Sequence, residues 1–329
     1  MKHGGDLTEA IAHYGGSPKM WLDLSTGINP WPWTIPQLQD EIWQRLPSNA
    51  DEAALTAAAR CAYRVPDDAD VVIAPGTQAL IQWLPRLADT GATAITGPTY
   101  SEHASAWRQA GHAVASFELG TIIAQDARHA VIVNPNNPDG RVVDRTTLVR
   151  IAHEVRDRGG WLVIDEAFAD LDPEMSAVAL CRELPVIVLR SFGKFFGLAG
   201  LRLGFAITSP QVAQTIKAAL GPWPCSGPAL AIGRAALSDD AWIARTREAL
   251  QHQAEKLDAV LTEAGWSIAG GTGLFRLARH PEAGSLHRIL GQNHIWCRSF
   301  DWAGDLLRFG LPPDDLGLDR LSEALRSHE

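Results

Sequence analysis

The feature that most constrains the fold is an alternation of short apolar runs with helix-like stretches through the middle of the chain. Seven runs rich in Val and Ile have the length of buried strands: Val71–Ala74, Ala92–Thr96, Ala113–Phe117, Ala130–Asn134, Trp161–Asp165, Val186–Ser191 and Leu203–Thr208. Helical patterns fill several gaps between them, at Thr77–Ala88, Ser101–Ala110 and Thr146–Arg158. This alternation predicts an α/β protein, with a three-layer α/β/α domain around a mainly parallel, seven-stranded sheet.

The pattern changes after about Ser209. Helical segments dominate as far as Ala264, and a final helix is expected from about Leu316. Between them, short strands are expected near Leu274–Leu277, Ile295–Cys297 and Leu306–Phe309. We therefore expect three parts: residues 1–46 as an N-terminal arm and part of a small domain, 47–209 as the large domain, and 210–329 as a C-terminal small α+β domain. The arm, rich in Gly, Pro and Trp, is expected to pack against the active site or a partner subunit.

Composition excludes several classes of protein. The 329 residues carry a net charge of -9, which argues against a nucleic-acid-binding surface. No apolar run reaches the roughly 20 residues of a membrane span, and the N-terminus lacks the pattern of a signal peptide. The four cysteines are far apart and lack metal-ligand spacing, so we expect no metal site and reduced, mostly buried thiols in a cytoplasmic protein.

Lys194 has a setting that points to chemistry. It follows the apolar run Val186–Ser191, and sites in parallel α/β folds form outside the carboxyl ends of strands. Its aromatic and apolar neighbours disfavour the charged amine, which lowers its pKa and helps it attack a carbonyl. A loop lysine that reaches solvent is the ordinary alternative. Ser191 before it and the sequence Gly-x-x-Gly-x-Arg after it favour the functional interpretation.

Two elements suit a phosphate monoester. Ser191 and Arg202 flank the lysine, and an arginine can donate two parallel hydrogen bonds to a phosphate. In the segment APGTQAL, a predicted strand ends at Ala74, the chain turns at Gly76, and a helix begins at Thr77, so that free backbone N–H groups face an anion. Taken alone, each element could equally be a strand-end cap, a surface salt bridge or a helix N-cap.

Two further strand ends carry polar groups. Asp165 ends a buried strand, where a carboxylate is costly unless it is paired. A protonated pyridine nitrogen would supply that pairing, while a magnesium-binding or helix-capping Asp remains an open alternative. The segment NPNNPDG after Ala130–Asn134 demands a fixed turn. One of its amides could bind a cofactor oxygen, although an ordinary turn is also possible.

These four motifs, in this order and over nearly the whole chain, resemble the fold-type I pyridoxal 5′-phosphate (PLP) enzymes. The resemblance is to the group with histidinol-phosphate aminotransferase and threonine-phosphate decarboxylase, and it implies a homodimer. It also implies that Lys194 forms a Schiff base with PLP, that Asp165 pairs with the pyridine nitrogen, that Asn137 binds the ring oxygen and that Tyr100 stacks on the ring. The implied phosphate contacts are Gly76, Thr77, Ser191 and Arg202, and Gln78 is a further candidate for binding the cofactor.

The same resemblance implies how a small phosphorylated amino acid is bound. Arg308 would grip the substrate α-carboxylate, and Arg298 is the candidate for its distal phosphate. For both, an exposed surface arginine is the alternative. Further substrate contacts are implied at His3, Gly27 and Asn29.

The N-terminal stretch narrows the resemblance to one branch. The sequences HGGD from His3 and LDLSTGINP from Leu22 resemble the threonine-phosphate decarboxylases of cobalamin biosynthesis. Phe168 agrees with this, because the aminotransferases usually carry a tyrosine there. Leu46 stands where many relatives have a tyrosine that reaches the partner's cofactor phosphate, which puts that contact in doubt. Gln78 also replaces the acidic or serine residue often found at its position.

The expected reaction is therefore PLP-dependent decarboxylation of L-threonine O-3-phosphate to (R)-1-amino-2-propanol O-2-phosphate. Amino transfer on a phosphorylated substrate such as histidinol phosphate is one alternative. Another is a non-catalytic binding or assembly protein for cobalamin side-chain attachment. A scaffold would not need a buried Asp165 together with Lys194 and Arg202, which argues against that class. A ligand-sensing regulator would need a DNA-binding domain, and the sequence has no visible helix-turn-helix.

Overall fold

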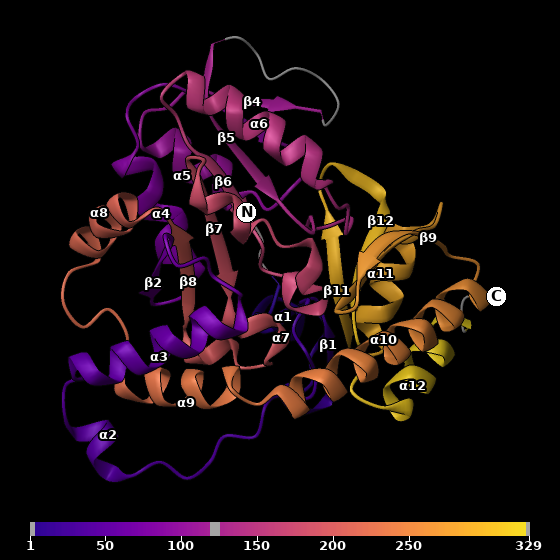
Figure 1. Ribbon diagram of the computed structural model, residues 1–329. Helices are drawn as coiled ribbons and strands as arrows, with labels where there is room; N and C mark the ends of the chain where they lie inside the picture. Colours follow the sequence, from indigo (N-terminus) through magenta and orange to yellow (C-terminus); the bar gives the residue numbers. More distant parts are fainter. Residues whose placement is uncertain (1–3, 119–125, 327–329) are drawn as a thin grey trace. The chain divides into compact units, whose positions relative to one another are not determined.

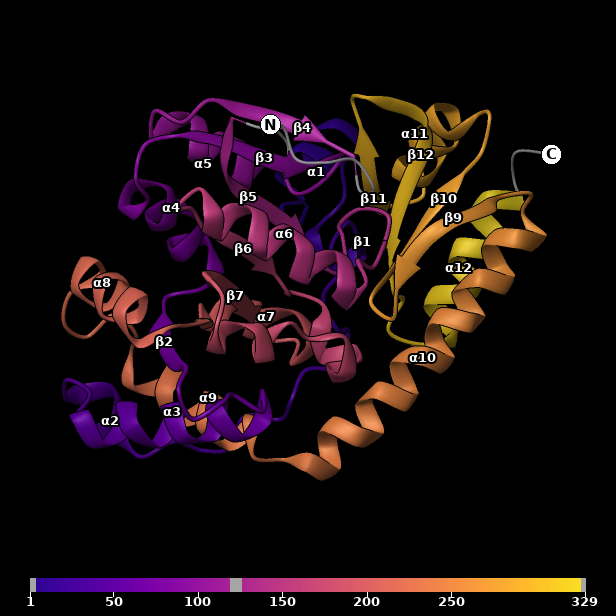
Figure 2. The same ribbon diagram turned by 45° about the horizontal axis from the view of Figure 1, so that its top comes forward.

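The computed structural model describes residues 4–118 and 126–326, and the chain divides into two compact units (Figures 1 and 2). The larger unit is Trp33–Asn137 with Arg141–Ala241, and the smaller is Met1–Pro32, Pro138–Gly140 and Trp242–Glu329. This division differs from the expected one, because 33–46 and 210–241 lie with the larger unit. The reason is packing: α8 (Pro210–Leu220) contacts β2, and α9 (Gly227–Leu237) packs along α3 (Asn49–Ala62) and α2 (Asp40–Gln44).

The larger unit is built on a seven-stranded sheet whose order is β2-β8-β7-β6-β5-β3-β4. All pairs are parallel except those of β8, which runs antiparallel to both of its neighbours. All seven predicted strands are confirmed, at β2 Asp70–Ala74, β3 Ala92–Thr96, β4 Val114–Phe117, β5 Ala127–Val133, β6 Leu162–Asp165, β7 Val186–Ser191 and β8 Gly204–Thr208.

Helices cover both faces of this sheet, as the sequence predicts. On one face, α4 (Thr77–Leu87), α5 (Glu102–Gln109) and α8 bury residues such as Leu80 and Trp107 in a shared core with Val131 and Ile187 of the strands. On the other face, α6 (Arg145–Asp157) lies across β5 and β6, and α3 packs on β2 (Figure 2). Shorter elements are α7 Phe192–Phe195 and the 3₁₀ turns Ala169–Leu171, Pro173–Met175, Val178–Arg182 and Ala199–Leu201.

The smaller unit has a five-stranded sheet of order β1-β11-β12-β10-β9. Its strands are β1 Leu22–Leu24, β9 Ser267–Thr272, β10 Phe275–Arg279, β11 Ile295–Phe300 and β12 Ala303–Gly310. The three expected strands are confirmed as β10, β11 and β12. Sequence reasoning missed β1, which is short, and β9, which contains two glycines. Its helices are α1 Thr8–Tyr14, α10 Asp240–Glu263, α11 Ala283–Gln292 and α12 Asp315–Arg326, with a 3₁₀ turn at Pro18–Met20.

Two features of the structure bear on the expectations about membrane spans and cysteines. Among the described residues, none of the helices combines the length and the apolar character needed to cross a bilayer. All four cysteines are free thiols, and Cys181, Cys225 and Cys297 are buried while Cys61 is exposed. The prediction of unpaired and mostly buried thiols is therefore confirmed.

Candidate active site

Three strand ends of the larger unit meet at one place because β8 is antiparallel. Gly204, the first residue of β8, pairs with Ala74 at the end of β2 and with Ser191 at the end of β7. Ser191 is buried, with 8% of its surface exposed. The segments that follow β2 and β7 and the one that precedes β8 therefore share one edge of the sheet.

Gly76 brings the Arg202 guanidinium over the start of α4. A Cβ atom added to Gly76 would lie 2.5 Å from Arg202 Nη2, and the backbone there has φ +81° and ψ 157°, which strongly favours glycine. Arg202 is itself left-handed at φ 52° and donates from Nη1 to the Ala199 carbonyl oxygen at 3.0 Å. A Cβ on Gly204 would lie 2.6 Å from the Thr77 nitrogen. A cation above a helix N-terminus is an arrangement that suits a phosphate.

Asp165 is a buried carboxylate with partners from two elements. It ends β6 and is 3% exposed. Its Oδ1 accepts from the Ala167 N–H at 3.1 Å, and its Oδ2 lies 2.9 Å from Nε2 of His103 on α5. Sequence reasoning missed His103. The available signal was spacing: His103 lies three residues after Tyr100, in the first turn of a predicted helix, and residues three apart in a helix lie on the same face.

Tyr100 belongs to a chain of hydrogen bonds beside this carboxylate. Its hydroxyl donates to Gln78 Oε1 at 3.1 Å, and Gln78 Nε2 donates to Glu102 Oε2 at 3.1 Å. Its ring lies edge-on to His103, with centroids 6.2 Å apart. Burial and the negative charge of Glu102 raise the pKa of Tyr100 to about 12, so the phenol stays protonated at neutral pH. The Gln78 side chain is thus engaged by Tyr100 and Glu102.

Lys194 lies in α7, directly after β7. It is half-buried, and its Nζ stands 5.9 Å from the centroid of the buried Phe168 ring. Its helix also carries Phe192 and Phe195, both fully buried. Gly193 lets this helix approach the next turn closely, because a Cβ there would lie 2.7 Å from the Ala199 Cα. Phe168 offers an apolar ring near the amine and no hydrogen-bond donor.

The asparagine turn lies at the end of β5 beside the Tyr100 loop. Asn136 donates from Nδ2 to the Pro98 carbonyl at 2.9 Å and accepts from the Thr99 hydroxyl at 2.6 Å. Asn134 accepts from the Val143 N–H at 2.9 Å. Asn137 follows them and is half-buried. The strands β3 and β5 are neighbours, which explains why their C-terminal loops are joined.

The predicted substrate-binding residues lie in the smaller unit. Arg298 of β11 and Arg308 of β12 are directly opposite each other, and Arg308 donates to the Ser25 carbonyl at 2.6 Å. Burial, with the nearby charge of Arg298, lowers the pKa of Arg308 to about 10. Two facing cations repel, and an anion between them would relieve that repulsion. Gly27 and Asn29 are buried, and Asn29 Oδ1 accepts from the Trp31 N–H at 2.8 Å; His3 lies outside the described residues.

Comparison with known proteins adds independent information. A model of the family "Aminotransferase class I and II" matches residues 37–324. A threonine-phosphate decarboxylase from Sinorhizobium sp is 44% identical over 99% of this chain and 98% of the relative. One from Pseudomonas aeruginosa is 41% identical over 99% of this chain and 97% of its own length. The solved structure of histidinol-phosphate aminotransferase from Sinorhizobium meliloti, in complex with pyridoxal-5′-phosphate, shares the fold with a TM-score of 0.82 at 18% identity, over 98% of this chain and 95% of that one.

Proposed function

Because this chain belongs to the class I and II aminotransferase family, we propose that it is a PLP-dependent decarboxylase acting on L-threonine O-3-phosphate in cobalamin biosynthesis. The observation that carries the proposal is the identity of 44% and 41% to two threonine-phosphate decarboxylases over almost the whole chain. The product would be (R)-1-amino-2-propanol O-2-phosphate. Buried free thiols such as Cys181 are in keeping with a reducing cytoplasm, where we expect the enzyme to act.

The residues of the larger unit fit the cofactor. Arg202 above the glycine turn at Gly76 provides a cradle for a phosphate, and a side chain at Gly76 would fill it. The buried Asp165 carboxylate suits a protonated ring nitrogen. Lys194 supplies an amine at a strand end beside an apolar ring. We propose that Thr77 and Ser191 complete the phosphate site, and that Tyr100 and Asn137 contact the ring.

When bound, PLP supplies an electron sink for the bond that breaks at the substrate α-carbon. In our proposal, Lys194 would hold the cofactor by its aldehyde group, and its amine would be the proton donor to the substrate α-carbon after carbon dioxide is lost. Asp165, oriented by His103, holds a proton at the ring nitrogen. Arg308 binds the α-carboxylate and Arg298 the distal phosphate, and the orientation they impose decides which bond breaks.

Amino transfer is the second candidate, because the same cofactor residues serve both reactions and a histidinol-phosphate aminotransferase shares the fold. Phe168 favours decarboxylation in our proposal. With no donor on its ring, the site lacks the tyrosine hydroxyl that the aminotransferases usually carry at this position.

The test is product analysis. Purified protein loaded with PLP is incubated with L-threonine O-3-phosphate, with and without a keto acid. We expect carbon dioxide and aminopropanol phosphate in equal amounts and independent of the keto acid. Keto-acid-dependent amino transfer from histidinol phosphate, without carbon dioxide from threonine phosphate, would reverse the assignment. Lys194→Ala is the control and should remove turnover, as well as the yellow colour that borohydride bleaches.

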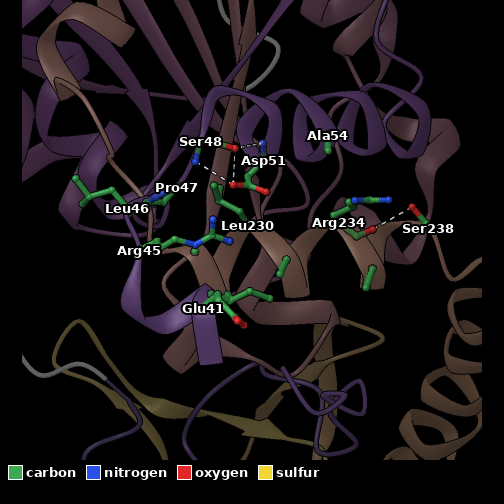
Figure 3. A pocket seen from close by; sticks show the side chains of 14 residues that line it. Glu41, Arg45, Leu46, Pro47, Ser48, Asp51, Ala54, Leu230, Arg234 and Ser238 are labelled. Atoms are coloured by element: carbon green, nitrogen blue, oxygen red, sulfur yellow. Dashed lines mark hydrogen bonds between the residues drawn. The ribbon is translucent and has the colours of Figure 1, made fainter. Parts of the chain in front are cut away.

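We also propose a homodimer formed through the surface around α2. A pocket of about 630 Å³ lies among α2, α3 and α9, with the Ser48–Asp51 cap in its wall (Figure 3). Large apolar side chains on and beside α2 are exposed, with Trp43 at 68% and Leu46 at 67%. The exposure of two large apolar side chains within four residues supports a contact surface at this segment.

Light scattering after size exclusion tests this surface. Trp43→Glu should yield monomers, whereas Trp302→Glu, which changes an exposed tryptophan of the smaller unit, should leave the dimer intact. A Trp43→Glu protein that remains dimeric would refute the proposed surface.

A further inference from the structure

A buried ionic cluster lies at the ends of β6 and β7, and no step proposed above uses it. Arg190 of β7 is 2% exposed. It donates from Nη1 to Glu166 Oε2 at 2.9 Å and from Nη2 to Asp170 Oδ1 at 2.5 Å. Its guanidinium carbon stands 4.4 Å from the centroid of the Tyr63 ring. One cation thus binds two carboxylates away from solvent.

Glu166 is held from a second side. Its carboxylate accepts from the Ser176 hydroxyl and from the Ala177 N–H, both at 2.6 Å. Its backbone N–H donates to the Leu189 carbonyl of β7 at 2.9 Å. The cluster therefore joins β7, the end of β6 and the turns that follow β6.

The two carboxylates mark the ends of a five-residue segment, 166–170, that carries two groups of the candidate active site. Between them, the Ala167 N–H donates to Asp165 Oδ1, and the Phe168 ring lies beside Lys194 Nζ. Arg190 is attached to both ends of this segment. Its own strand continues directly through Ser191 to Lys194.

We propose that Arg190 is a positioning residue that clamps segment 166–170, and so fixes the orientation of the Asp165 carboxylate and the place of Phe168 beside Lys194. The inference rests on the proposed function, in which Asp165 and Lys194 bind the cofactor. Arg190 itself contacts none of the reacting groups.

The Arg190 guanidinium balances the charge of two buried carboxylates. Without the guanidinium, Glu166 and Asp170 face each other as buried like charges, which drives the ends of the segment apart or forces one carboxylate to take up a proton. Either change moves the Ala167 N–H relative to Asp165. A buried ion pair adds little net stability compared with apolar packing, so a role in positioning gives the cluster a reason to exist.

The experiment compares PLP binding to apoprotein variants. Arg190→Met keeps the length of the side chain without its charge, and Arg190→Lys keeps the charge without the fork of donors. Arg60→Met is the matched control, because Arg60 donates to the Ala69 and Pro66 carbonyls in the same unit and its loss should affect stability alone. Three quantities are measured for each protein: the PLP dissociation constant, the pKa at which the absorbance of Lys194-bound PLP changes with pH, and the midpoint of unfolding.

For Arg190→Met we expect a PLP dissociation constant raised about 10-fold or more and a displaced absorbance pKa, because a small misplacement of reacting groups has large effects. Arg190→Lys should have a PLP dissociation constant and an absorbance pKa between those of Arg190→Met and the wild type. Arg60→Met should match the wild type in both quantities. If Arg190→Met does not fold, Asp170→Asn, which releases one end of the segment, should show the same changes more weakly.

The inference is overturned if a folded Arg190→Met protein keeps the PLP affinity and the absorbance pKa of the wild type. If Arg190→Met does not fold, the same result for Asp170→Asn overturns it. The cluster would then have a purely stabilising role. Failure of the wild type itself to bind PLP would instead refute the proposed function. The two failures are therefore distinguishable.

Discussion

Gly76→Ala separates the two roles of the glycine turn, which are backbone conformation and room for Arg202. At φ +81° and ψ 157°, residue 76 occupies a region that is essentially restricted to glycine. An alanine methyl group would also lie 2.5 Å from Arg202 Nη2. The guanidinium is the far end of a flexible side chain, so it can move aside at little cost, whereas the backbone cannot relax in the same way.

These two effects predict different magnitudes in different assays. The backbone conformation should lower the free energy of unfolding of the apoprotein by about 1–3 kcal/mol. Displacement of Arg202 should weaken the binding of a phosphate, since a hydrogen bond from a charged group is worth about 1.5–3 kcal/mol. That range corresponds to a loss of PLP affinity of about 10- to 100-fold.

The assay is titration of the apoprotein with PLP and with pyridoxal, which lacks the phosphate. We expect Gly76→Ala to weaken PLP binding far more than pyridoxal binding. The dissociation constant of pyridoxal divided by that of PLP should therefore fall towards one. Gly200→Ala is the matched control, because a Cβ there meets no atom within 4 Å. It should keep the wild-type ratio.

A Gly76→Ala protein that keeps the wild-type preference for PLP over pyridoxal would refute the reasoning. It would mean that Arg202 and the start of α4 do not bind the phosphate. A loss of both affinities to the same degree would also contradict it, since that result indicates general damage to the fold.

Three other substitutions test single contacts. His103→Phe leaves the buried Asp165 carboxylate without its side-chain donor and should cost the apoprotein about 1–3 kcal/mol in urea unfolding; an unchanged midpoint would contradict this. Burial lowers the pKa of His129, so the native state binds fewer protons than the unfolded state, and stability should fall as pH drops from 7 through the ordinary histidine range and below. His129→Gln should show a shallower fall between pH 7 and 5 than the wild type, and equal slopes would refute this origin. Arg308→Met should raise KM for threonine phosphate about 10- to 100-fold, as the loss of a charged hydrogen bond implies, and leave PLP affinity unchanged; weakened PLP binding would place Arg308 elsewhere in the mechanism.

The sequence predicts the large sheet well because its strands are buried on both faces and read as continuous apolar runs. It does not predict that β8 is antiparallel, which is why Gly204 pairs with the last residues of β2 and β7. It does not predict β9, because Gly270 and Gly271 interrupt any apolar pattern. The sequence also does not predict the boundary between the two units. Residues 33–46 belong to the larger unit because of contacts between residues far apart in the chain, such as the hydrogen bond from the Trp33 N–H to the Phe196 carbonyl.

Within the candidate site, residues that follow strands were found and those that support them were not. Asp165 ends a predicted strand, Lys194 follows one, and Arg202 comes just before one, so the sequence alone indicates where these residues stand. His103 is contributed by a helix, so that its contact with Asp165 depends on how α5 packs on the sheet. Arg190 carried a visible signal, a charged residue inside an apolar strand, because such a residue must find partners when it is buried.

The adjacent acids Asp165 and Glu166 make the register of β6 against β7 part of the chemistry. Their side chains reach different partners, His103 for the first and Arg190 for the second. If the two strands paired one residue out of step, every side chain of β6 would change face, and the two acids would exchange surroundings. The wrong carboxylate would then face α5, while Arg190 would meet a shorter side chain. A single-step slip would thus leave a folded sheet without a functional site, and the two ion pairs of Arg190 oppose that slip.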